Sequence, residues 1–307
     1  MAGSPAGRCD DTIVFMAKSR ATLDGRSGTG AGRFTRALGV GPDFVLADSD
    51  PRSTPGHTGG KLDGVDLLAA TVPELEDLQE RLYAGSTTGS AAALLLVIQG
   101  MDTAGKGGIM RHVVGSVDPQ GVRLTAFKAP TADELGHPFL WRIRNALPQP
   151  GEIGVFDRSH YEDVLIARVH NLVPPATWSR RYGQINSFER SVAAAGTTIV
   201  KVMLNVSNGE QKARLSERLE RPEKHWKYNP ADVDERGHWS SYQQAYQVAI
   251  TKCTTEHAPW FVVPADRKWY ARLAVQQLVV EHLRALDLQW PPATFDVKSE
   301  KARLART

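Results

Sequence analysis

A glycine-rich loop that ends in Gly-Lys is the part of this sequence with the clearest chemistry. Residues Gly100 to Lys106 have the spacing G-x-x-x-x-G-K, in which consecutive backbone N–H groups surround a phosphate and the lysine reaches over it. An apolar run over residues 91–99 precedes the loop and a helix-like GKGGIMRHVVGSV follows it, which is the context that the motif requires. The pattern predicts phosphate contacts from Gly100, Met101, Thr103, Ala104, Gly105, Lys106, Gly107 and Gly108.

One position departs from the common pattern, and this departure affects which residues can ligate a metal ion. Gly107 follows the lysine, where most nucleotide triphosphatases carry the Ser or Thr that ligates Mg²⁺. Two carboxylates can replace that ligand: Asp102 inside the loop, and Asp157 after the apolar run over residues 153–156. Mg²⁺ prefers such oxygen ligands, and open parallel sheets bind ligands where their strands end. We therefore predict that both acids hold Mg²⁺, although a turn carboxylate that only caps backbone N–H groups is the alternative for Asp102.

The residues after Asp157 add a phosphate-binding group. Arg158 offers a planar fork of N–H donors for phosphate oxygens beside a metal-binding carboxylate. Glu162 is expected in the first turn of a following helix, where it contacts either the acceptor or the residues that position it. His160 is expected to be structural.

A basic segment over residues 212–227 predicts a lid. Its lysines and arginines alternate with glutamates, so a solvated helix face with paired charges is the alternative. After Pro222 the helix is expected to give way to a loop with Trp226 and Tyr228, which suits a mobile lid over about residues 208–238. Such lids bring arginines onto phosphates during transfer. The arginines that we expect to act on the phosphoryl group are Arg214 and Arg218.

The elements that position these residues follow an alternating pattern. Strands are expected near 91–99, 122–127, 152–156, 197–205 and 260–263, with helices between them. Residues 62–84 are expected to be helical, with Pro73 interrupting the helix. This predicts an α/β protein of the P-loop kinase fold, with a parallel sheet, helices on both faces and a helical lid. The predicted organisation is a flexible arm over 1–60, a kinase domain over 61–290 and a tail without fixed structure over 291–307.

Composition restricts the class of protein. Hydrophobic residues make up 41% of the 307 residues, enough for a sizeable core, and no apolar run has the length of a membrane span. Cys9 and Cys253, in a predicted tail and a predicted helix, indicate neither a disulfide framework nor a zinc site. The first residues contain acids where a signal peptide would have an apolar core. We expect a cytoplasmic enzyme.

Several longer motifs together resemble a known family. In order along the chain, these are VIQGMDTAGKGG, DPQGVRLTAFKAPTADELGHPFLWRIRNALP, IGVFDRSHYEDVLIARVHNLVP, RLERPEKHWKYNPADVDER and APWFVVPADRKWYAR. From about residue 50 to about residue 286 the sequence resembles the polyphosphate kinase 2 family, class III in particular. The resemblance implies Mg²⁺-dependent transfer of a phosphoryl group from inorganic polyphosphate to AMP and ADP, with the reverse reaction also possible.

The residues fit this chemistry in physical terms. A terminal phosphate oxygen of a nucleotide is ionised at neutral pH, so the attack needs no strong general base, and catalysis rests on positioning and charge neutralisation. The expected catalytic residues are Asp102, Lys106, Asp157, Arg158, Glu162, Arg214 and Arg218. A polyanionic donor also needs a basic channel, and its candidates are Arg111, Lys128, Arg142, Arg144, Arg168, Lys224 and Lys227.

Two other functions use similar residues. A thymidylate-kinase-like enzyme with ATP as donor would also need the loop, the Asp-Arg pair and a basic lid, but Gly107 in place of Ser or Thr disfavours it. A non-catalytic nucleotide-binding switch would tolerate the loss of Lys106 or Arg158, which this sequence keeps. The expected partners are polyphosphate and adenine nucleotides, without nucleic acid or membrane, and we expect a homo-oligomer.

Overall fold

Five parallel strands form one sheet with the order β2-β3-β1-β4-β5. They are β1 (Ala93–Gln99), β2 (Val122–Ala126), β3 (Ile153–Asp157), β4 (Thr197–Asn205) and β5 (Trp260–Pro264). A computed structural model describes residues 31–41 and 43–307. The predicted α/β fold with a parallel sheet is confirmed, and the strand bounds differ from the predicted ones by at most two residues.

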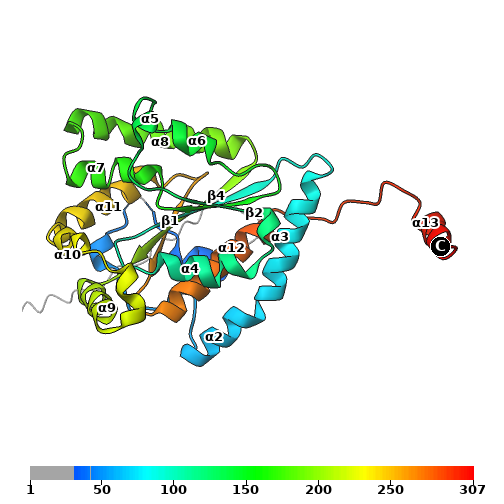
Figure 1. Cartoon of the computed structure of the whole chain (residues 1–307), viewed down its shortest axis with the longest axis horizontal. Coiled ribbons are helices and arrows are strands. Elements are labelled where there is room, and N and C mark those ends of the chain that lie inside the picture. The colour runs from blue at the N-terminus through cyan, green and yellow to red at the C-terminus, as the bar shows by residue number, and fades with distance from the viewer. Residues whose placement is uncertain (1–30, 42) are drawn as a thin grey trace, which may run out of the picture. The chain divides into compact units, whose positions relative to one another are not determined.

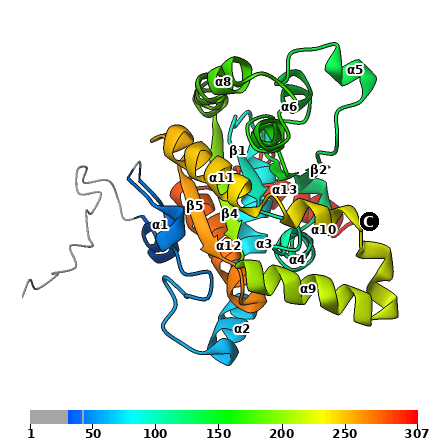
Figure 2. The ribbon, with the colours of Figure 1, turned by 90° about the vertical axis from the view of Figure 1, so that its left-hand side faces the viewer.

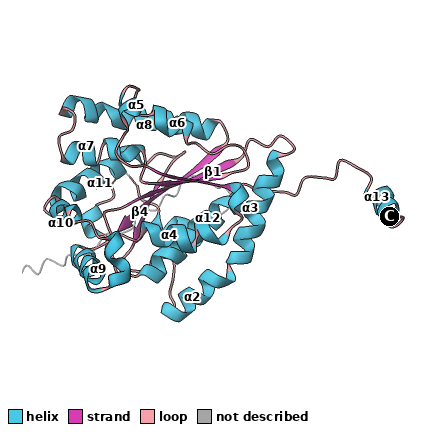
Figure 3. Cartoon of the chain, in the orientation of Figure 1, coloured by secondary structure: helices cyan, strands magenta, loops and turns pink. Residues whose placement is uncertain are grey.

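The strands are apolar because the sheet is covered on both faces. All seven residues of β1 and all five of β5 are buried, as are the first four of β3. Parallel strands covered by helices are typically such continuous apolar runs. β1 pairs with β3 on one side and β4 on the other, and the sheet lies between layers of helices (Figure 3). The glycine loop that follows β1 therefore starts in the middle of the sheet.

Two layers of helices cover the sheet (Figures 1 and 2). One face carries α6 (Trp141–Asn145), α8 (Pro175–Ala194) and α11 (Trp239–Cys253), and the other carries α3 (Val72–Ser86), α4 (Lys106–His112) and α12 (Lys268–Ala285). α8 and α12 both pack against β4 from these opposite faces. Among the residues that the structure describes, no helix is both long and apolar enough to cross a bilayer.

The remaining helices are short and lie mainly in the connections. The α-helices are α1 (Arg33–Leu38), α2 (Lys61–Ala70), α5 (Ala132–Leu135), α7 (Ile166–Val169), α9 (Asn208–Glu220), α10 (Ala231–Arg236) and α13 (Val297–Leu304). The 3₁₀ helices are η1 (Leu46–Asp48), η2 (Val114–Ser116), η3 (Pro119–Gly121), η4 (His160–Asp163) and η5 (Pro222–Lys227). The helix expected over 62–84 is divided as predicted, with Pro73 in the first turn of α3, where its missing N–H breaks no helical hydrogen bond.

The two ends of the described chain differ from the expected arm and tail. From Ala31 onward the predicted arm belongs to the same compact unit as the sheet, with Phe34 and Leu38 in the core. Glu281 of α12 accepts hydrogen bonds from the backbone N–H of Phe34 at 3.0 Å. Residues 291–307, expected to lack fixed structure, contain α13, whose residues are all exposed. Residues 1–30, which include Cys9, lie outside the described part of the chain.

A buried ion pair joins β4 to α8 beneath the end of β3. Lys201 Nζ donates to Glu189 Oε2 at 2.6 Å, to the Tyr161 hydroxyl at 2.9 Å and to the Cys253 carbonyl at 2.7 Å. Glu189 Oε1 also lies 3.1 Å from His160 Nε2. Burial alone raises the pKa of Glu189, but the Lys201 charge and the His160 hydrogen bond outweigh it and leave that pKa lowered. His160 is therefore part of a buried polar network, in agreement with the structural role expected for it.

Removing one partner of this pair should destabilise the protein strongly. Lys201→Met leaves the Glu189 carboxylate buried without its counter-charge, and we expect the free energy of unfolding to fall by about 3–5 kcal/mol. The double variant Lys201→Met/Glu189→Leu should recover much of that loss, because no charge then remains buried. Urea unfolding at neutral pH measures both.

The same ion pair predicts that the free energy of unfolding depends on pH. Because the pKa of Glu189 is lowered in the folded protein, its stabilising contribution is complete above the ordinary value of 4.5. It should be lost as the pH falls from there through the folded-state pKa. The difference in free energy of unfolding between wild type and Lys201→Met should therefore become smaller below pH 4.5. A gap of the same size across the acid range would contradict this contribution.

Candidate active site

The glycine loop between β1 and α4 has a backbone that side chains would obstruct. Thr103 and Gly105 have φ angles of 62° and 119° in the left-handed region, where Gly105 carries no steric penalty. A Cβ at Gly100 would lie 3.0 Å from the Leu204 carbonyl oxygen and 3.0 Å from Ala104 Cβ. The loop therefore turns tightly over the end of β1, as the motif requires.

Lys106 reaches back across this loop. Its Nζ donates to the Gly100 carbonyl at 2.7 Å and lies 3.5 Å from the Met101 carbonyl. Burial lowers the pKa of Lys106, Asp102 and Asp157 act to raise it, and the net result is a lowered value. The Lys106 amine is thus buried at the loop, where the charges of both predicted metal-binding carboxylates act on it.

The ends of β1 and β3 meet through Asp102 and Arg158. Asp157 pairs in register with Ile98 at the end of β3, and the Arg158 N–H donates to the Ile98 carbonyl at 3.1 Å. Arg158 has a φ of 63°, which a residue with a side chain adopts at a cost of about 1–2 kcal/mol. This backbone turns its guanidinium toward the loop, where Nη2 lies 3.1 Å from Asp102 Oδ1. Burial acts to lower the pKa of Arg158, but Glu162 and Asp102 raise it, so the net shift is upward.

A cavity of about 230 Å³ opens beside this pair. The predicted residues that line it are Gly100, Met101, Asp102, Arg158 and Glu162. The others come from α7, α11 and the predicted lid: Leu165, Ile166, Gln211, Asn229, Ala231, Asp232, Glu235, Tyr242 and Tyr246. Burial raises the pKa of Glu162, although Arg158 and Lys106 oppose the shift. Glu162 lies in the first turn of a helix, as expected, and that helix is the 3₁₀ helix η4.

Comparison with known proteins agrees with this arrangement. The family profile described as polyphosphate kinase 2 matches residues 63–290, which include the loop, Asp157, Arg158 and the predicted lid. The chain belongs to the polyphosphate kinase 2 family.

Three relatives illustrate the similarity. An AMP/ADP-polyphosphate phosphotransferase of Meiothermus ruber is 45% identical over 262 residues, which are 84% of this chain and 97% of the relative. An ADP-polyphosphate phosphotransferase of Rhodopseudomonas palustris is 43% identical over 241 residues, 75% of this chain and 82% of the relative. The crystal structure of polyphosphate kinase 2 from Arthrobacter aurescens matches with a TM-score of 0.89 and 56% identity, and covers 90% of this chain and 98% of that one.

The sequence reasoning missed the aromatic side of this polyphosphate kinase 2 cavity. Tyr242 and Tyr246 lie one turn apart on α11 and both line the cavity. The Tyr242 hydroxyl donates to Glu235 Oε2 at 2.8 Å, and His170 Nε2 lies 3.0 Å from Glu235 Oε1. A pair of tyrosines four residues apart just after a predicted lid was the available signal, but this spacing is equally typical of core packing.

Gln211 is a second residue that the sequence analysis missed. Its Nε2 donates to the Asp102 carbonyl at 3.0 Å, and its Oε1 accepts from Arg236 at 2.6 Å. One amide therefore connects the glycine loop to α10 in the lid, which only the folded structure reveals.

The predicted lid over 208–238 consists of α9, η5 and α10, so most of the loop expected after Pro222 is helical.

Arg214 has a different position from the one expected. Its Nε donates to Glu210 at 2.8 Å, Nη1 donates to the Thr103 and Ala104 carbonyls, and Nη2 donates to the Ala265 and Asp266 carbonyls. All five guanidinium donors thus have protein acceptors. Arg214 fixes the back of the glycine loop, and its predicted contact with the phosphoryl group is not supported.

Arg218 is nearer to the expected role. It donates to Asp232 Oδ2 at 3.2 Å and to the Lys227 carbonyl at 2.9 Å, and Asp232 lines the cavity. Its side chain is 23% exposed, whereas that of Arg214 is 6% exposed. Of the two predicted arginines, Arg218 is therefore the more exposed one, and it contacts the cavity lining through Asp232.

The other predicted basic residues lie outside this cavity. Arg168 and Arg144 lie over the rings of Trp178 and Phe188, at 4.8 and 4.9 Å from the ring centroids. Arg142 donates to the Lys128 carbonyl at 2.9 Å beyond the end of β2. In η5, Lys224 pairs with Glu217, and the Lys227 amine lies over the Trp226 ring. The seven basic residues expected to form a polyphosphate channel thus do not form one continuous surface. Of these seven, Arg111 lies on α4, the helix that follows the glycine loop.

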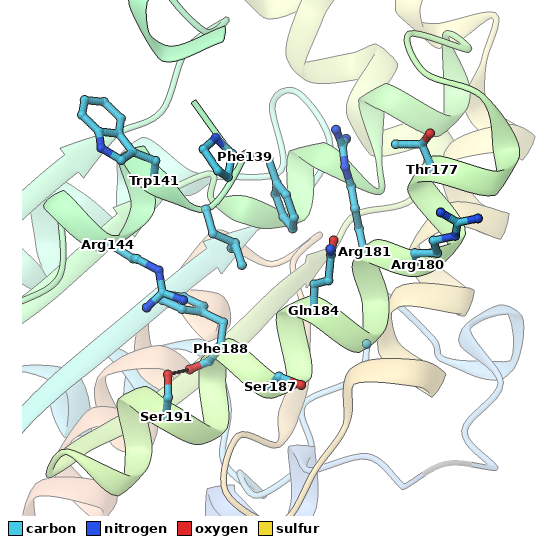
Figure 4. A pocket seen from close by; sticks show the side chains of 13 residues that line it. Phe139, Trp141, Arg144, Thr177, Arg180, Arg181, Gln184, Ser187, Phe188 and Ser191 are labelled. Carbon is cyan, nitrogen blue, oxygen red and sulfur yellow. Dashed lines mark hydrogen bonds between the residues drawn. The ribbon is translucent and has the colours of Figure 1, made fainter. Parts of the chain in front are cut away.

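A larger cavity of about 1040 Å³ lies along α8, away from the glycine loop (Figure 4). Aromatic and arginine side chains line it, among them Phe139, Trp141, Arg144 and Arg181. No carboxylate and no residue of the glycine loop belongs to its lining. Size therefore does not identify the reactive site, and the smaller cavity has the residues for phosphoryl transfer.

The position of Arg214 predicts a stability difference between the two lid arginines. Arg214→Ala should lower the free energy of unfolding by at least about 2 kcal/mol, because it leaves several buried carbonyl oxygens without donors. The matched variant Arg218→Ala loses a partly exposed ion pair and should cost less than about 1 kcal/mol. Chemical unfolding compares them, and equal losses would show that Arg214 does not clamp the loop.

Proposed function

We propose that this protein transfers a phosphoryl group from inorganic polyphosphate to AMP and ADP, which gives ADP and ATP, and that the reaction also runs in reverse. The contact of Asp102 with Arg158 carries the proposal, because it brings the glycine loop and the end of β3 to one cavity. The names of the relatives from Meiothermus ruber and Rhodopseudomonas palustris support the donor and the acceptors. The proposal includes a cytoplasmic location and a homo-oligomer, which fractionation and light scattering can test.

The reaction needs no acid or base from the protein. An oxygen of the acceptor's terminal phosphate attacks the terminal phosphorus of polyphosphate and forms a new P–O bond. The bond from that phosphorus to the bridging oxygen breaks, and its electron pair leaves with the shortened chain. Both the attacking and the leaving groups are anions, so the protein accelerates the reaction by positioning them and by neutralising charge.

The residues around the loop divide these tasks. The backbone N–H groups of the loop and Lys106 hold the donor's terminal phosphates, and Arg158 neutralises the transferred group. Arg218 is the lid residue closest to this role. Glu162, whose pKa burial raises, lies on the acceptor side of Arg158 and positions that arginine.

The cavity suits the nucleotide better than the polyphosphate chain. Asp232, Glu235 and Glu162 line it, and such a concentration of carboxyl groups repels a long polyanion. Tyr242 and Tyr246 offer apolar ring surface for a nucleoside. The acceptor therefore enters here with its terminal phosphate toward Arg158. A loosely held base would accommodate acceptors that differ in length by one phosphate.

Asp102 and Asp157 would hold Mg²⁺. An ion held by these two carboxylates would take its remaining ligands from phosphates and water. When bound, the ion would neutralise negative charge on the phosphate groups.

The acceptor prediction is tested by a time course. Purified protein, freed of adenylate kinase, is incubated with AMP, polyphosphate and Mg²⁺, and every nucleotide is quantified. We expect ADP first and ATP after a lag, because ADP must accumulate before it becomes an acceptor. Phosphorylation of ADP alone would restrict the proposal to one acceptor. Transfer from ATP but never from polyphosphate would indicate the thymidylate-kinase-like alternative, and no transfer would indicate the non-catalytic switch.

The metal ligands are tested by substitution. Asp102→Asn and Asp157→Asn should each lower turnover by on the order of 10² or more, because charge neutralisation is the main catalytic contribution. Asp118→Asn is a matched control, since Asp118 is exposed and caps η3 away from the cavity. Wild-type activity with unchanged Mg²⁺ dependence in the Asp102 variant would remove that residue from the site.

A further inference from the structure

One carboxylate in the wall of the acceptor cavity joins three segments of the chain. Glu235 lies on α10 of the lid, and its Oε1 and Oε2 are 3.0 and 3.1 Å from His170 Nε2. Its Oε2 also accepts a hydrogen bond from the Tyr242 hydroxyl of α11 at 2.8 Å. Glu235 and Tyr242 belong to the cavity lining and His170 does not. The contact therefore ties the end of α7 to α10 and α11 at the edge of the cavity (Figure 1).

The way in which α7 ends fixes the backbone of His170. His170 follows the last residue of α7, and Asn171 comes next with a φ of 52° in the left-handed region. The Asn171 N–H donates to the Arg168 carbonyl at 3.3 Å. The Leu172 N–H donates to the Ala167 carbonyl at 2.9 Å. These two hydrogen bonds form the Schellman motif, in which asparagine is one of the few residues with a side chain that adopts the left-handed backbone readily. The imidazole therefore starts from a defined position.

The chemistry of these side chains determines which of them donates. A carboxylate only accepts hydrogen bonds, so His170 Nε2 carries a hydrogen toward Glu235. Burial raises the pKa of Tyr242, and the hydrogen bond to Glu235 and its charge raise it further, so the hydroxyl stays a donor. The His238 ring lies edge-on to the His170 ring, with the ring centroids 4.8 Å apart. Glu235 thus has two donors from the protein, which fix the direction of its carboxylate.

This carboxylate is also what connects α10 to the body of the protein. Asp232 and Arg236 of α10 bond to Arg218 and Gln211, which both lie on α9 within the lid itself. In the part of the chain that the structure describes, the side-chain hydrogen bonds and ion pairs that join α10 to segments outside residues 208–238 are those of Glu235. Without them α10 would keep its contacts to α9 only.

We propose that His170 is a positioning residue for the acceptor: through Glu235 it holds α10 against the end of α7 and so fixes this wall of the cavity. The inference rests on the proposed function and adds to it a residue outside the cavity that maintains the acceptor site. His170 acts on α10 only, whereas Arg214 ties α9 to the glycine loop independently. Its loss should therefore weaken binding of the nucleotide more than it affects the donor or the transfer step.

Two substitutions of His170 test the contact. His170→Leu keeps an apolar side chain but removes the donor, and it should raise the KM for ADP about tenfold, the effect of one hydrogen bond to a charged group. The kcat and the KM for polyphosphate should stay within about twofold, because the glycine loop and α9 keep their contacts. His170→Gln places an amide N–H donor at the reach of Nε2 and should return the KM for ADP to within about threefold of the wild type.

A double variant shows whether His170 acts through Glu235. In a Glu235→Leu background, the addition of His170→Leu should change the KM for ADP by less than about twofold, because both substitutions remove the same contact. His137→Leu is the matched control, since the His137 ring stacks on Trp141, 4.1 Å between centroids, and is not part of the cavity. It should leave every KM unchanged. A wild-type KM for His170→Leu, no recovery in His170→Gln, or full additivity in the double variant would overturn the proposal.

Two measurements without turnover separate this result from failure of the proposed function. If the wild type transfers no phosphate, calorimetric titration with ADP alone still applies: weaker binding by His170→Leu that His170→Gln restores supports the role of His170, and equal binding overturns it. If the wild type binds no ADP, amide hydrogen exchange over residues 231–236 needs no ligand. Faster exchange in His170→Leu than in the wild type supports the contact with α10, and unchanged exchange overturns it.

Discussion

The buried pair of Lys201 and Glu189 is the interaction on which the position of the reactive residues depends. Through it, β4, α8, the end of α11 and η4 share one polar network. Desolvating two charges is costly unless every donor and acceptor finds a partner, so this network tolerates little displacement of Tyr161 and His160. Those residues directly follow Arg158 and Ser159, and Ser159 also accepts a hydrogen bond from Gln99 at the end of β1 at 3.1 Å. The segment that carries Arg158 and Glu162 is therefore held from below and from the side, which maintains the left-handed backbone of Arg158.

With that segment fixed, the charges of the surrounding side chains distinguish the nucleotide from the polyphosphate chain. The contact of Asp102 with Arg158 lies in the lining of a cavity that also contains Glu162, Asp232 and Glu235. A nucleotide brings one short anionic end, which Arg158 can neutralise while carboxyl groups surround the rest of the cavity. A polyphosphate chain is anionic along its whole length and is stabilised only where basic groups continue. In the proposed function this cavity therefore suits the nucleotide better than the polyphosphate chain.

The sequence predicted the parts that local patterns determine. β1 and β3 are continuous apolar runs followed by glycine or acid, so their ends, and with them Asp102, Asp157 and Arg158, could be placed from spacing alone. Arg214 and Arg218 could not be distinguished, because they lie four residues apart on α9 and share a helix face. Only the packing of α9 against the loop shows that Arg214 lies beneath it. Tyr242 and Gln211 come from segments distant in sequence from the glycine loop, and their contacts are not encoded by any local pattern.

The position of Arg214 also limits how the lid can move. Its hydrogen bonds tie the middle of α9 to the Thr103 and Ala104 carbonyls of the loop and to the Ala265 and Asp266 carbonyls after β5. Ser207 caps α9 and donates to Asp266 as well. Rotation of α9 would break these buried hydrogen bonds together, whereas η5 and α10 are held by partly exposed contacts such as Arg236 with Gln211. α9 is therefore held more firmly against the glycine loop than the segment after Arg218 is.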